Sequence, residues 1–318
     1  MRALDHSESD PGAHGDVGYF SGSAGMMAFD SLNTIQRDSI ISFPAIGLSV
    51  NPPASFQLFG RTIYFYGVII AAAFIIGILY CGRKAQKAGI REDDVYDVLL
   101  WLLPSAIVGA RLYFVLFNLD YYLRNPSEIA AVWEGGLAIY GGVLAGALVI
   151  LVFTKKRKIS TLAFLDLFLT ACILGQAIGR WGNFTNREAF GRPTEAFFRM
   201  GLTDASGSTI YVHPTFLYES LWNFAGFLLM NHTLSKAKKY DGQCFYLYCL
   251  WYGIGRAAIE GLRTDSLYIP GTAIRVSQLL SALLATFGLI MLLCRHGRQT
   301  PSAFPSASAS ASPEESKK

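Results

Sequence analysis

The sequence predicts an all-α polytopic membrane protein with seven transmembrane helices, an N-terminus outside the membrane and a C-terminus in the cytoplasm. Three observations lead to this fold class. The chain of 318 residues is 52% hydrophobic and only 16% charged, which is too little charge to cover the surface of a water-soluble protein. Long apolar runs recur from residue 62 onward. Basic residues are concentrated in alternate loops between these runs.

The chain divides into three regions. Residues 1–58 form a polar N-terminal extension in which no basic segment precedes an apolar core, so we expect no cleavable signal peptide. Residues 59–297 contain every apolar run and form the membrane domain. Residues 298–318 are rich in Ser, Ala and Pro and are expected to be a disordered cytoplasmic tail. The extension carries none of the motifs described below, so we expect its removal to leave the function intact.

Each apolar run is long enough to be a membrane helix, because about 20 helical residues cross the ~30 Å hydrocarbon core. The fourth run ends in a turn rich in Gly and Arg, and the fifth begins just after Pro214, at a position where a helix tolerates proline. The predicted spans are 62–82, 95–117, 136–154, 159–181, 215–234, 243–261 and 273–294.

The loop charges give an independent test of seven spans, because Lys and Arg in short loops accumulate on the cytoplasmic side. The loops after the first, third, fifth and seventh spans are dense in basic residues. They contain Arg83, Lys84, Lys87, Arg91, Lys155, Lys156, Arg157, Lys158, Lys236, Lys238, Lys239, Arg295 and Arg298. The other loops contain Arg124, Arg187, Arg192, Arg199 and Arg263. An odd number of spans with the N-terminus outside satisfies every loop.

Several classes of function are excluded by composition. A net charge of +4 is too small to indicate a nucleic-acid partner. The five cysteines lie in or beside apolar runs with no C-x-x-C pair and no neighbouring histidine. Buried thiols are therefore expected rather than a disulfide framework or a zinc site. We expect neither a metal nor a cofactor.

Ionisable side chains within the spans are candidate site residues, because a charge that faces lipid costs about 2.5–3.5 kcal/mol. They are Arg111, Asp166, Arg180, Glu219, Arg256, Glu260 and Arg275. Arg111, Arg180, Glu219 and Arg275 are close to interfaces, where ordinary anchoring is an equally good explanation. Arg256 lies deeper, and Glu260 shares its helix face at i+4. That pair either directs Arg256 into a cavity or is a structural ion pair.

The densest polar stretch is GQAIGRWGNFTNREAFGR, residues 175–192, where the fourth span meets an outer loop. It contains Arg180, Asn183, Asn186 and Glu188 among several glycines. Small residues free backbone amides to face a ligand, and Arg offers a planar fork of donors suited to phosphate oxygens. The pattern favours an anion-binding turn at headgroup level, although Gly-rich breaks between membrane helices are also common.

Three further polar side chains lie on the same outer side. Tyr140 stands between two glycine pairs in WEGGLAIYGGVLAG, where it is either a hydrogen-bond donor or an interfacial anchor. His213 belongs to the dense motif YVHPTFLYES, and Tyr66 lies near the start of the first span. With the anion-binding turn they outline a basic, polar cavity in the outer half of the membrane.

Four motifs together resemble those of the bacterial prolipoprotein diacylglyceryl transferases. GRWGNFTNREAFGR resembles the signature R-x-G-N-F-x-N-x-E-x-x-G, and HPTFLYE resembles H-P-x-x-L-Y-E. YGIGRAAIEGLR is similar to Y-G-x-x-R-x-x-x-E-x-x-R, and GGLAIYGG to G-G-x-x-x-H-G-G. IYFYG and GARLYFVLF also fit. The resemblance covers residues 60–295 and all seven spans.

The resemblance implies a plasma-membrane enzyme that moves the diacylglyceryl group of phosphatidylglycerol to the lipobox cysteine of a prolipoprotein signal peptide. A thioether forms and glycerol phosphate leaves. The family's essential arginines correspond to Arg180 and Arg256. Its proposed substrate contacts correspond to Tyr66, Asn183, Glu188, Tyr252 and Glu260, and we add Asn186 and His213. The chain departs from the family at Tyr140, where most members have histidine, so an imidazole base is not available there.

The residues themselves are consistent with this chemistry. Negative charge grows on the leaving phosphate, and fixed cations stabilise that transition state more than the ground state. We therefore assign catalytic roles to Arg180 and Arg256. The nucleophile is the thiol of the substrate. We expect Tyr140 to orient this thiol or to relay its proton, and His213 is a less favoured candidate for the base.

Two other classes compete with this interpretation. A transporter for anions also lines its path with arginine, but it needs polar residues in the cytoplasmic half. The inner parts of the first, third and seventh spans, AAAFIIGILY, ALVILVF and ATFGLIMLLC, are apolar instead. A seven-helix receptor or retinal protein fits less well, because the seventh span has no internal Lys and the strongest motifs lie at helix ends.

Overall fold

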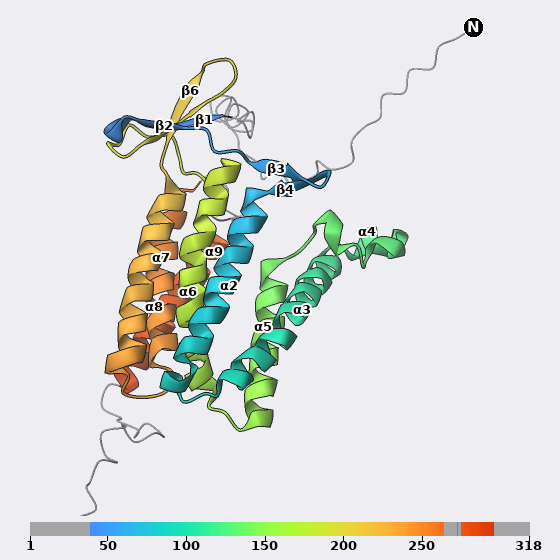
Figure 1. The fold of residues 1–318 in the computed structure, drawn as a ribbon, viewed down its shortest axis with the longest axis vertical. Coiled ribbons are helices and arrows are strands. Elements are labelled where there is room, and N and C mark those ends of the chain that lie inside the picture. Colours follow the sequence, from blue (N-terminus) through green and yellow to red (C-terminus); the bar gives the residue numbers. More distant parts are fainter. Residues whose placement is uncertain (1–38, 264–271, 273–274, 296–318) are drawn as a thin grey trace, which may run out of the picture.

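The computed structural model describes residues 39–263, 272 and 275–295. In this part of the chain, a long helix occupies most of each of the seven predicted spans (Figure 1). The long helices are α2 (Phe65–Ala85), α3 (Glu92–Phe117), α5 (Ile139–Arg157), α6 (Thr161–Asn186), α7 (Thr215–His232), α8 (Gln243–Glu260) and α9 (Val276–Arg295). Short helical segments are η1 (Pro44–Ile46), η2 (Gln86–Ala88), α4 (Leu119–Arg124), η3 (Pro126–Glu128), η4 (Val132–Glu134) and η5 (Thr233–Ala237).

Five of these helices are long and apolar enough to cross a membrane. They are α2 with its extension to Ala88, α3, α5, α6 and α9. The prediction of a largely helical protein with several membrane-spanning segments is confirmed. Helices α7 and α8 fall short of the same hydropathy standard, because they carry polar and charged side chains such as Glu219, Asn223 and Arg256.

The long helices form two groups (Figure 1). Helix α6 packs against α2 and α7, while α8 packs against α9, and together they make the main bundle. Helices α3 and α5 pack chiefly on each other and lean away from it. A Cβ on Gly141 would clash with the backbone oxygen of Gly109, so α3 and α5 touch backbone to backbone. Small residues permit such close approach between membrane helices.

A buried carboxylate fixes the end of the bundle opposite the strands. Asp166 on α6 is fully buried and accepts hydrogen bonds from the backbone N–H groups of Gly242, at 2.8 Å, and Phe245, at 2.9 Å. Lys238 Nζ lies 3.1 Å from the same carboxylate and also pairs with Asp241. Burial alone lowers the pKa of Lys238, but these two carboxylates outweigh it and raise the pKa. Asp166 therefore binds the start of α8 to α6.

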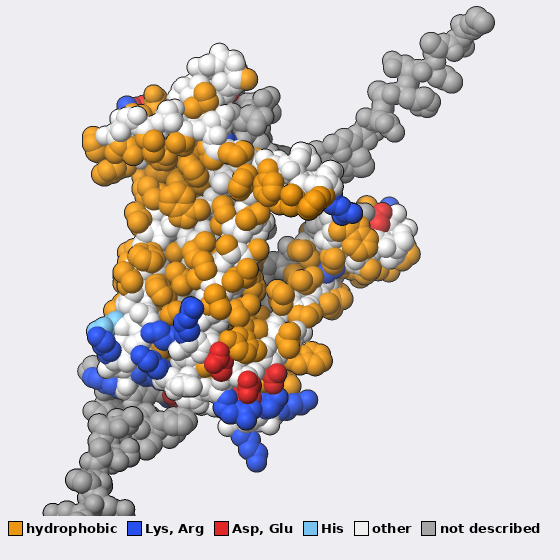
Figure 2. Space-filling view, in the orientation of Figure 1, with side chains coloured by type: hydrophobic (Ala, Val, Ile, Leu, Met, Phe, Trp, Pro, Cys, Tyr) orange, Lys and Arg blue, Asp and Glu red, His pale blue; other side chains and the backbone are white. Residues whose placement is uncertain are grey.

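The space-filling view separates apolar and basic surfaces (Figure 2). Hydrophobic side chains cover the middle of the molecule, and Lys and Arg side chains gather at the end away from the strands. That end includes Arg83 and Lys84 in the last turn of α2 and Lys155 to Arg157 in the last turn of α5. An apolar middle with one basic end is the distribution expected for a membrane protein.

The all-α prediction is wrong in one respect, because two small antiparallel sheets cap the other end of the bundle (Figure 1). The strands are β1 (Ile40–Phe43), β2 (Leu48–Val50), β3 (Ser55–Leu58), β4 (Arg61–Tyr64), β5 (Met200–Thr203) and β6 (Thr209–Val212). Four of them form a sheet in the order β2-β1-β5-β6, and β3 and β4 form a hairpin. Strands of three or four residues are too short to show a period-two pattern in the sequence.

Strand β1 places part of the N-terminal segment inside the sheet. Ile41 pairs with Leu202 of β5 and with Val50 of β2, and its side chain is fully buried. Arg187, at the end of α6, donates to the backbone oxygen of Ser39 at 3.1 Å and to Asn51 Oδ1 at 2.6 Å. We therefore revise our expectation for the extension: residues 40–58 contribute to the two sheets, and their removal should destabilise the protein.

The substitution Ile41→Ala tests this contribution. Ile41 packs with Met200, Leu202, Val212 and Phe216, and the side chain leaves a cavity when it is truncated. We expect a loss of about 2–5 kcal/mol in the free energy of unfolding, typical of a buried Ile→Ala change. Thermal unfolding in detergent measures it. The neighbour Ile40, 45% exposed, is the matched control, and equal shifts for Ile40→Ala and Ile41→Ala would contradict the prediction.

Candidate functional site

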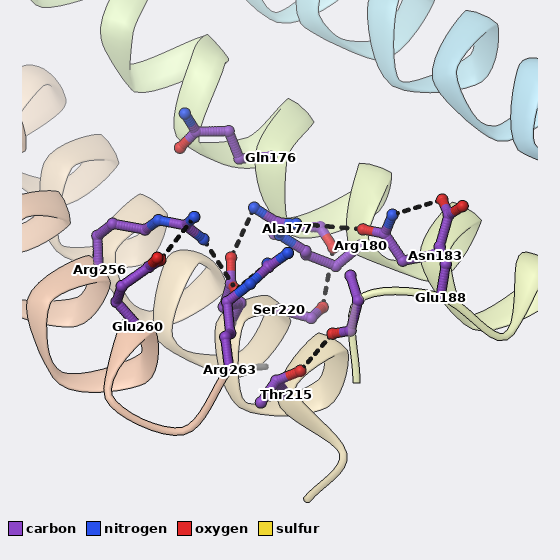
Figure 3. A network of polar contacts seen from close by, with 12 residues as sticks. Gln176, Ala177, Arg180, Asn183, Glu188, Thr215, Ser220, Arg256, Glu260 and Arg263 are labelled. Atoms are coloured by element: carbon purple, nitrogen blue, oxygen red, sulfur yellow. Dashed lines mark hydrogen bonds and ion pairs between the residues drawn. The ribbon is translucent and has the colours of Figure 1, made fainter. Parts of the chain in front are cut away.

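Three helices bring charged side chains together at their strand-side ends (Figure 3). Arg180 lies in the last two turns of α6, and Glu219 lies in the second turn of α7. Arg256 and Glu260 are one turn apart at the end of α8, so they share one face of the helix. Arg263 follows α8 and points to the same place (Figure 3).

Glu219 is the centre of this network. Its Oε2 lies 2.6 Å from Arg180 Nη2, while its Oε1 lies 3.3 Å from Arg256 Nη1 and 3.4 Å from Arg263 Nη1. The Glu219 side chain is only 7% exposed. A buried carboxylate needs charged or hydrogen-bonding partners to offset its lost hydration. One carboxylate therefore holds three guanidinium groups, each from a different part of the chain.

Glu260 forms a second contact point beside it. Its Oε2 pairs with Arg256 Nη2 at 2.8 Å, and its backbone oxygen accepts a hydrogen bond from Arg275 at the start of α9. Among the described contacts, the guanidinium groups of Arg180, Arg256 and Arg263 meet at the Glu219 carboxylate, and Arg256 also pairs with Glu260. Guanidinium groups gathered in this way offer the planar forks of donors that suit phosphate oxygens.

A chain of hydrogen bonds leads from Arg180 to the surface. Arg180 Nη1 donates to Asn183 Oδ1 at 3.1 Å, and Asn183 Nδ2 donates to Glu188 Oε1 at 2.8 Å. Helix α6 ends there because Arg187 adopts a left-handed conformation with φ of 52°. The turn brings Glu188 back over the helix, and its N–H donates to the backbone oxygen of Asn183 at 3.1 Å. Figure 3 shows this line of residues along α6.

Two predicted tyrosines lie close to the network. The ring of Tyr66 lies against Gly182 of α6, where an added Cβ would come within 2.8 Å of Tyr66 Cδ2. Gly182 therefore makes room for Tyr66 beside the helix that carries Arg180. Tyr252, one turn before Arg256, stacks on Tyr248 with ring centroids 5.4 Å apart. The Tyr248 hydroxyl accepts a hydrogen bond from Gln176 Nε2 at 2.9 Å.

Tyr140 lies apart from the arginines in the described contacts. It is in the first turn of α5, 44% exposed, and its ring is tilted against that of Tyr113, with the ring centroids 6.4 Å apart.

The loop before Tyr140 is held by Arg111, which is buried and not an interfacial anchor. Arg111 donates to the backbone oxygens of Glu128 at 2.6 Å, Ile129 at 2.9 Å, Gly135 at 2.8 Å and Gly136 at 3.1 Å.

His213 and Asn186 also lie outside the network that the described contacts define. His213 Nδ1 is 3.5 Å from the Tyr218 hydroxyl, and the His213 backbone oxygen accepts from Gly191 N–H at 2.9 Å. Among the described residues, the buried Asn186 Oδ1 has no hydrogen-bond partner. The arginines, Asn183, Glu188 and Glu260 are therefore brought together, while Tyr140, His213 and Asn186 are not.

The sequence did not reveal the central role of Glu219 or the part played by Arg263. Glu219 was one of several interfacial charges, although it ends the motif HPTFLYE. Arg263 ends the motif YGIGRAAIEGLR, which is the signal in the sequence, but by position it is a loop charge. Its backbone pairs with Gly191, and Arg192 N–H donates to the Leu262 oxygen at 2.8 Å, which draws Arg263 toward the bundle. This long-range contact between the two loops shows that Arg263 is part of the network.

Comparison with known proteins decides the family. The model of the prolipoprotein diacylglyceryl transferase family matches residues 53–294, which include every residue of the arginine network. The chain belongs to this family. Strands β1 and β2 lie before the matched region, although they are part of the four-stranded sheet.

Individual relatives agree with the family match. A phosphatidylglycerol–prolipoprotein diacylglyceryl transferase of Finegoldia magna is 46% identical over 237 residues, which cover 74% of this chain and 93% of the relative. The enzyme of the same name from Limosilactobacillus reuteri is 44% identical over 259 residues, covering 78% of this chain and 93% of the relative. The enzyme of the same name from Lactiplantibacillus plantarum is 43% identical over 257 residues, which cover 78% of this chain and 90% of the relative.

Proposed function

We infer that this protein transfers the diacylglyceryl group of phosphatidylglycerol to the thiol of the lipobox cysteine in prolipoproteins. The products are a thioether-linked lipoprotein precursor and glycerol phosphate. Membership of the prolipoprotein diacylglyceryl transferase family supports this reaction, as do relatives of that name at 41–46% identity. The observation that carries the site is the convergence of Arg180, Arg256 and Arg263 on one buried carboxylate.

The arginine network suits the bond that has to break. The cysteine sulfur attacks the glyceryl carbon that is esterified to phosphate, the C–O bond breaks, and the electron pair leaves with the phosphate. Negative charge grows on the departing monoester, where fixed guanidinium groups stabilise the transition state. Arg180 and Arg256 both contact Glu219, so they lie close enough to contact a single phosphate. We propose that these two residues form the catalytic clamp.

The remaining site residues have proposed substrate roles. Asn183 and Glu188 extend the network from Arg180, and Tyr66, Tyr252 and Glu260 flank it. Asn186 and His213 are proposed contacts at the rim. Tyr140 is proposed to orient the incoming thiol or to relay its proton, which requires the peptide to contact both α5 and the main bundle.

We propose that α7 and α8 also cross the membrane, which gives seven spans. Both helices lie beside α6 along the bundle in Figure 1, and α6 is itself long and apolar enough to span. The strand-side end is assigned to the outside and the basic end to the cytoplasm, because basic loops remain inside. This arrangement places the N-terminus outside, the C-terminus inside and the site in the outer half of a bacterial cell membrane.

Mass measurement tests the reaction directly. Purified protein is incubated with phosphatidylglycerol and a lipobox peptide, and the peptide mass is determined. We expect the Cys-containing peptide to gain one diacylglyceryl unit, while a peptide with Ser in place of Cys stays unmodified, because a hydroxyl is a weaker nucleophile than a thiol. An unmodified Cys peptide would contradict the proposed activity.

The substitution Arg180→Lys tests the clamp. Lysine keeps the positive charge but loses the fork of donors that contacts Glu219 and Asn183 together. We expect kcat/KM to fall by ~10²–10³, as for the loss of one fixed transition-state donor. Arg124→Lys on α4 is the control for the same chemical change outside the network. Activity near that of the unsubstituted protein would mean that a point charge is sufficient.

Replacing Tyr140 by Phe and by His separates its proposed roles. Phe removes only the hydroxyl, so we expect a clear loss of kcat if that group orients or deprotonates the thiol. His supplies the family's usual base and is expected to retain activity. Initial rates with phosphatidylglycerol and the lipobox peptide measure both variants, with Tyr96→Phe at the opposite end as control. Full activity of the Phe variant would remove Tyr140 from the chemistry.

A further inference from the structure

Two tryptophans join α7 to α8 by a reciprocal contact. Trp222 Nε1 on α7 donates to the backbone oxygen of Trp251 on α8 at 3.0 Å. Trp251 Nε1 donates in return to the backbone oxygen of Trp222 at 2.9 Å. The two indole rings are stacked, with centroids 4.4 Å apart and an interplanar angle of 22°. Each helix thus binds the other through both a ring face and a hydrogen bond.

Two glycines make this contact sterically allowed. The carbonyl of residue i in an α-helix accepts from the N–H of residue i+4, so Gly226 lies next to the Trp222 oxygen and Gly255 next to the Trp251 oxygen. A Cβ on Gly226 would lie 2.5 Å from Trp251 Nε1, and one on Gly255 would clash with Trp222 Nε1. Each indole therefore fills the space that a side chain at the partner glycine would need.

The paired tryptophans lie close to the arginine network, farther from the strand-side ends of α7 and α8. Trp222 is three residues beyond Glu219 on α7, and Trp251 is five residues before Arg256 on α8. At about 1.5 Å per residue these separations are about 4.5 and 7.5 Å along the helices. A slide of α8 against α7 by the rise of one residue would displace the Arg256 backbone by about 1.5 Å relative to Glu219, whose Oε1 lies 3.3 Å from Arg256 Nη1. The register of the two helices thus sets the geometry of the network.

We propose that Trp222 and Trp251 are positioning residues that fix the register of α7 against α8 and so hold Arg256 and Arg263 at Glu219. The two reciprocal bonds resist sliding in both directions, because a shift either way lengthens at least one of them. Neither tryptophan touches the arginines in the described contacts, so both act through their helices. This inference rests on the proposed transferase activity, which the unsubstituted protein must show first.

The variants Trp222→Phe and Trp251→Phe test the proposal. Phenylalanine keeps an aromatic ring for stacking but removes the N–H that donates across the interface. We expect kcat to fall by about 10- to 100-fold, the scale of a ~1 Å misplacement of catalytic groups. The KM for the lipobox peptide should stay within about two-fold. Rates are measured on folded protein, well below the midpoint of thermal unfolding of each variant.

The substitutions Gly226→Ala and Gly255→Ala disrupt the same tryptophan contact in a different way, because the new Cβ displaces the indole of the partner helix. We expect the same selective loss of kcat. Gly146→Ala on α5, where a Cβ meets nothing within 4 Å, and Trp101→Phe, whose side chain is exposed, are the matched controls. These glycine variants also decide the question if a Phe variant does not fold.

A direct distance measurement separates positioning from stability. Spin labels at Leu228 on α7 and Ile254 on α8, both exposed, report an axial shift of the helices. A changed distance together with lower kcat supports the proposal. Variants that unfold at lower temperature but keep the kcat and the label distance of the unsubstituted protein overturn it. Inactivity of the unsubstituted protein would instead refute the proposed function.

Discussion

The site depends on one electrostatic constraint: Glu219 is buried, and it has to be compensated by positive charge. Arg180, Arg256 and Arg263 meet this requirement from α6, from α8 and from the segment after α8. The carboxylate between them reduces their mutual repulsion. The same interaction links α6, α7 and α8 through their charged side chains.

The rest of the fold brings these side chains to one level. Asp166 holds the start of α8 to α6 at the opposite end, so the two helices that carry Arg180 and Arg256 are aligned by contacts at both ends. Gly182 admits Tyr66 beside α6, and the left-handed turn at Arg187 returns the chain over Asn183. The Asp166 and Gly182 contacts join segments far apart in the sequence, and each depends on one buried polar group or one glycine.

Much of this arrangement is readable from the sequence. Apolar runs of about 20 residues locate the helices, because the hydrocarbon thickness sets a minimum length. The i, i+4 spacing of Arg256 and Glu260 predicts their contact, which is 2.8 Å. The sheets are not readable, since β1 and β5 are four-residue strands whose pairing depends on distant segments. The role of Glu219 is hidden for the same reason: nothing in HPTFLYE indicates which cations will surround its last residue. The Tyr140 motif predicts a polar group near the site, but its helix belongs to the α3 and α5 pair.

The pairing of β1 with β5 has a consequence for the order in which the chain assembles. Ile41 emerges early during synthesis, whereas its partner Leu202 follows only after four of the long helices. Contacts between such distant segments form slowly, because a long loop has to close first. The first strand can pair with β2 at once, but its other partner, β5, is made only after α6, so the four-stranded sheet is completed late.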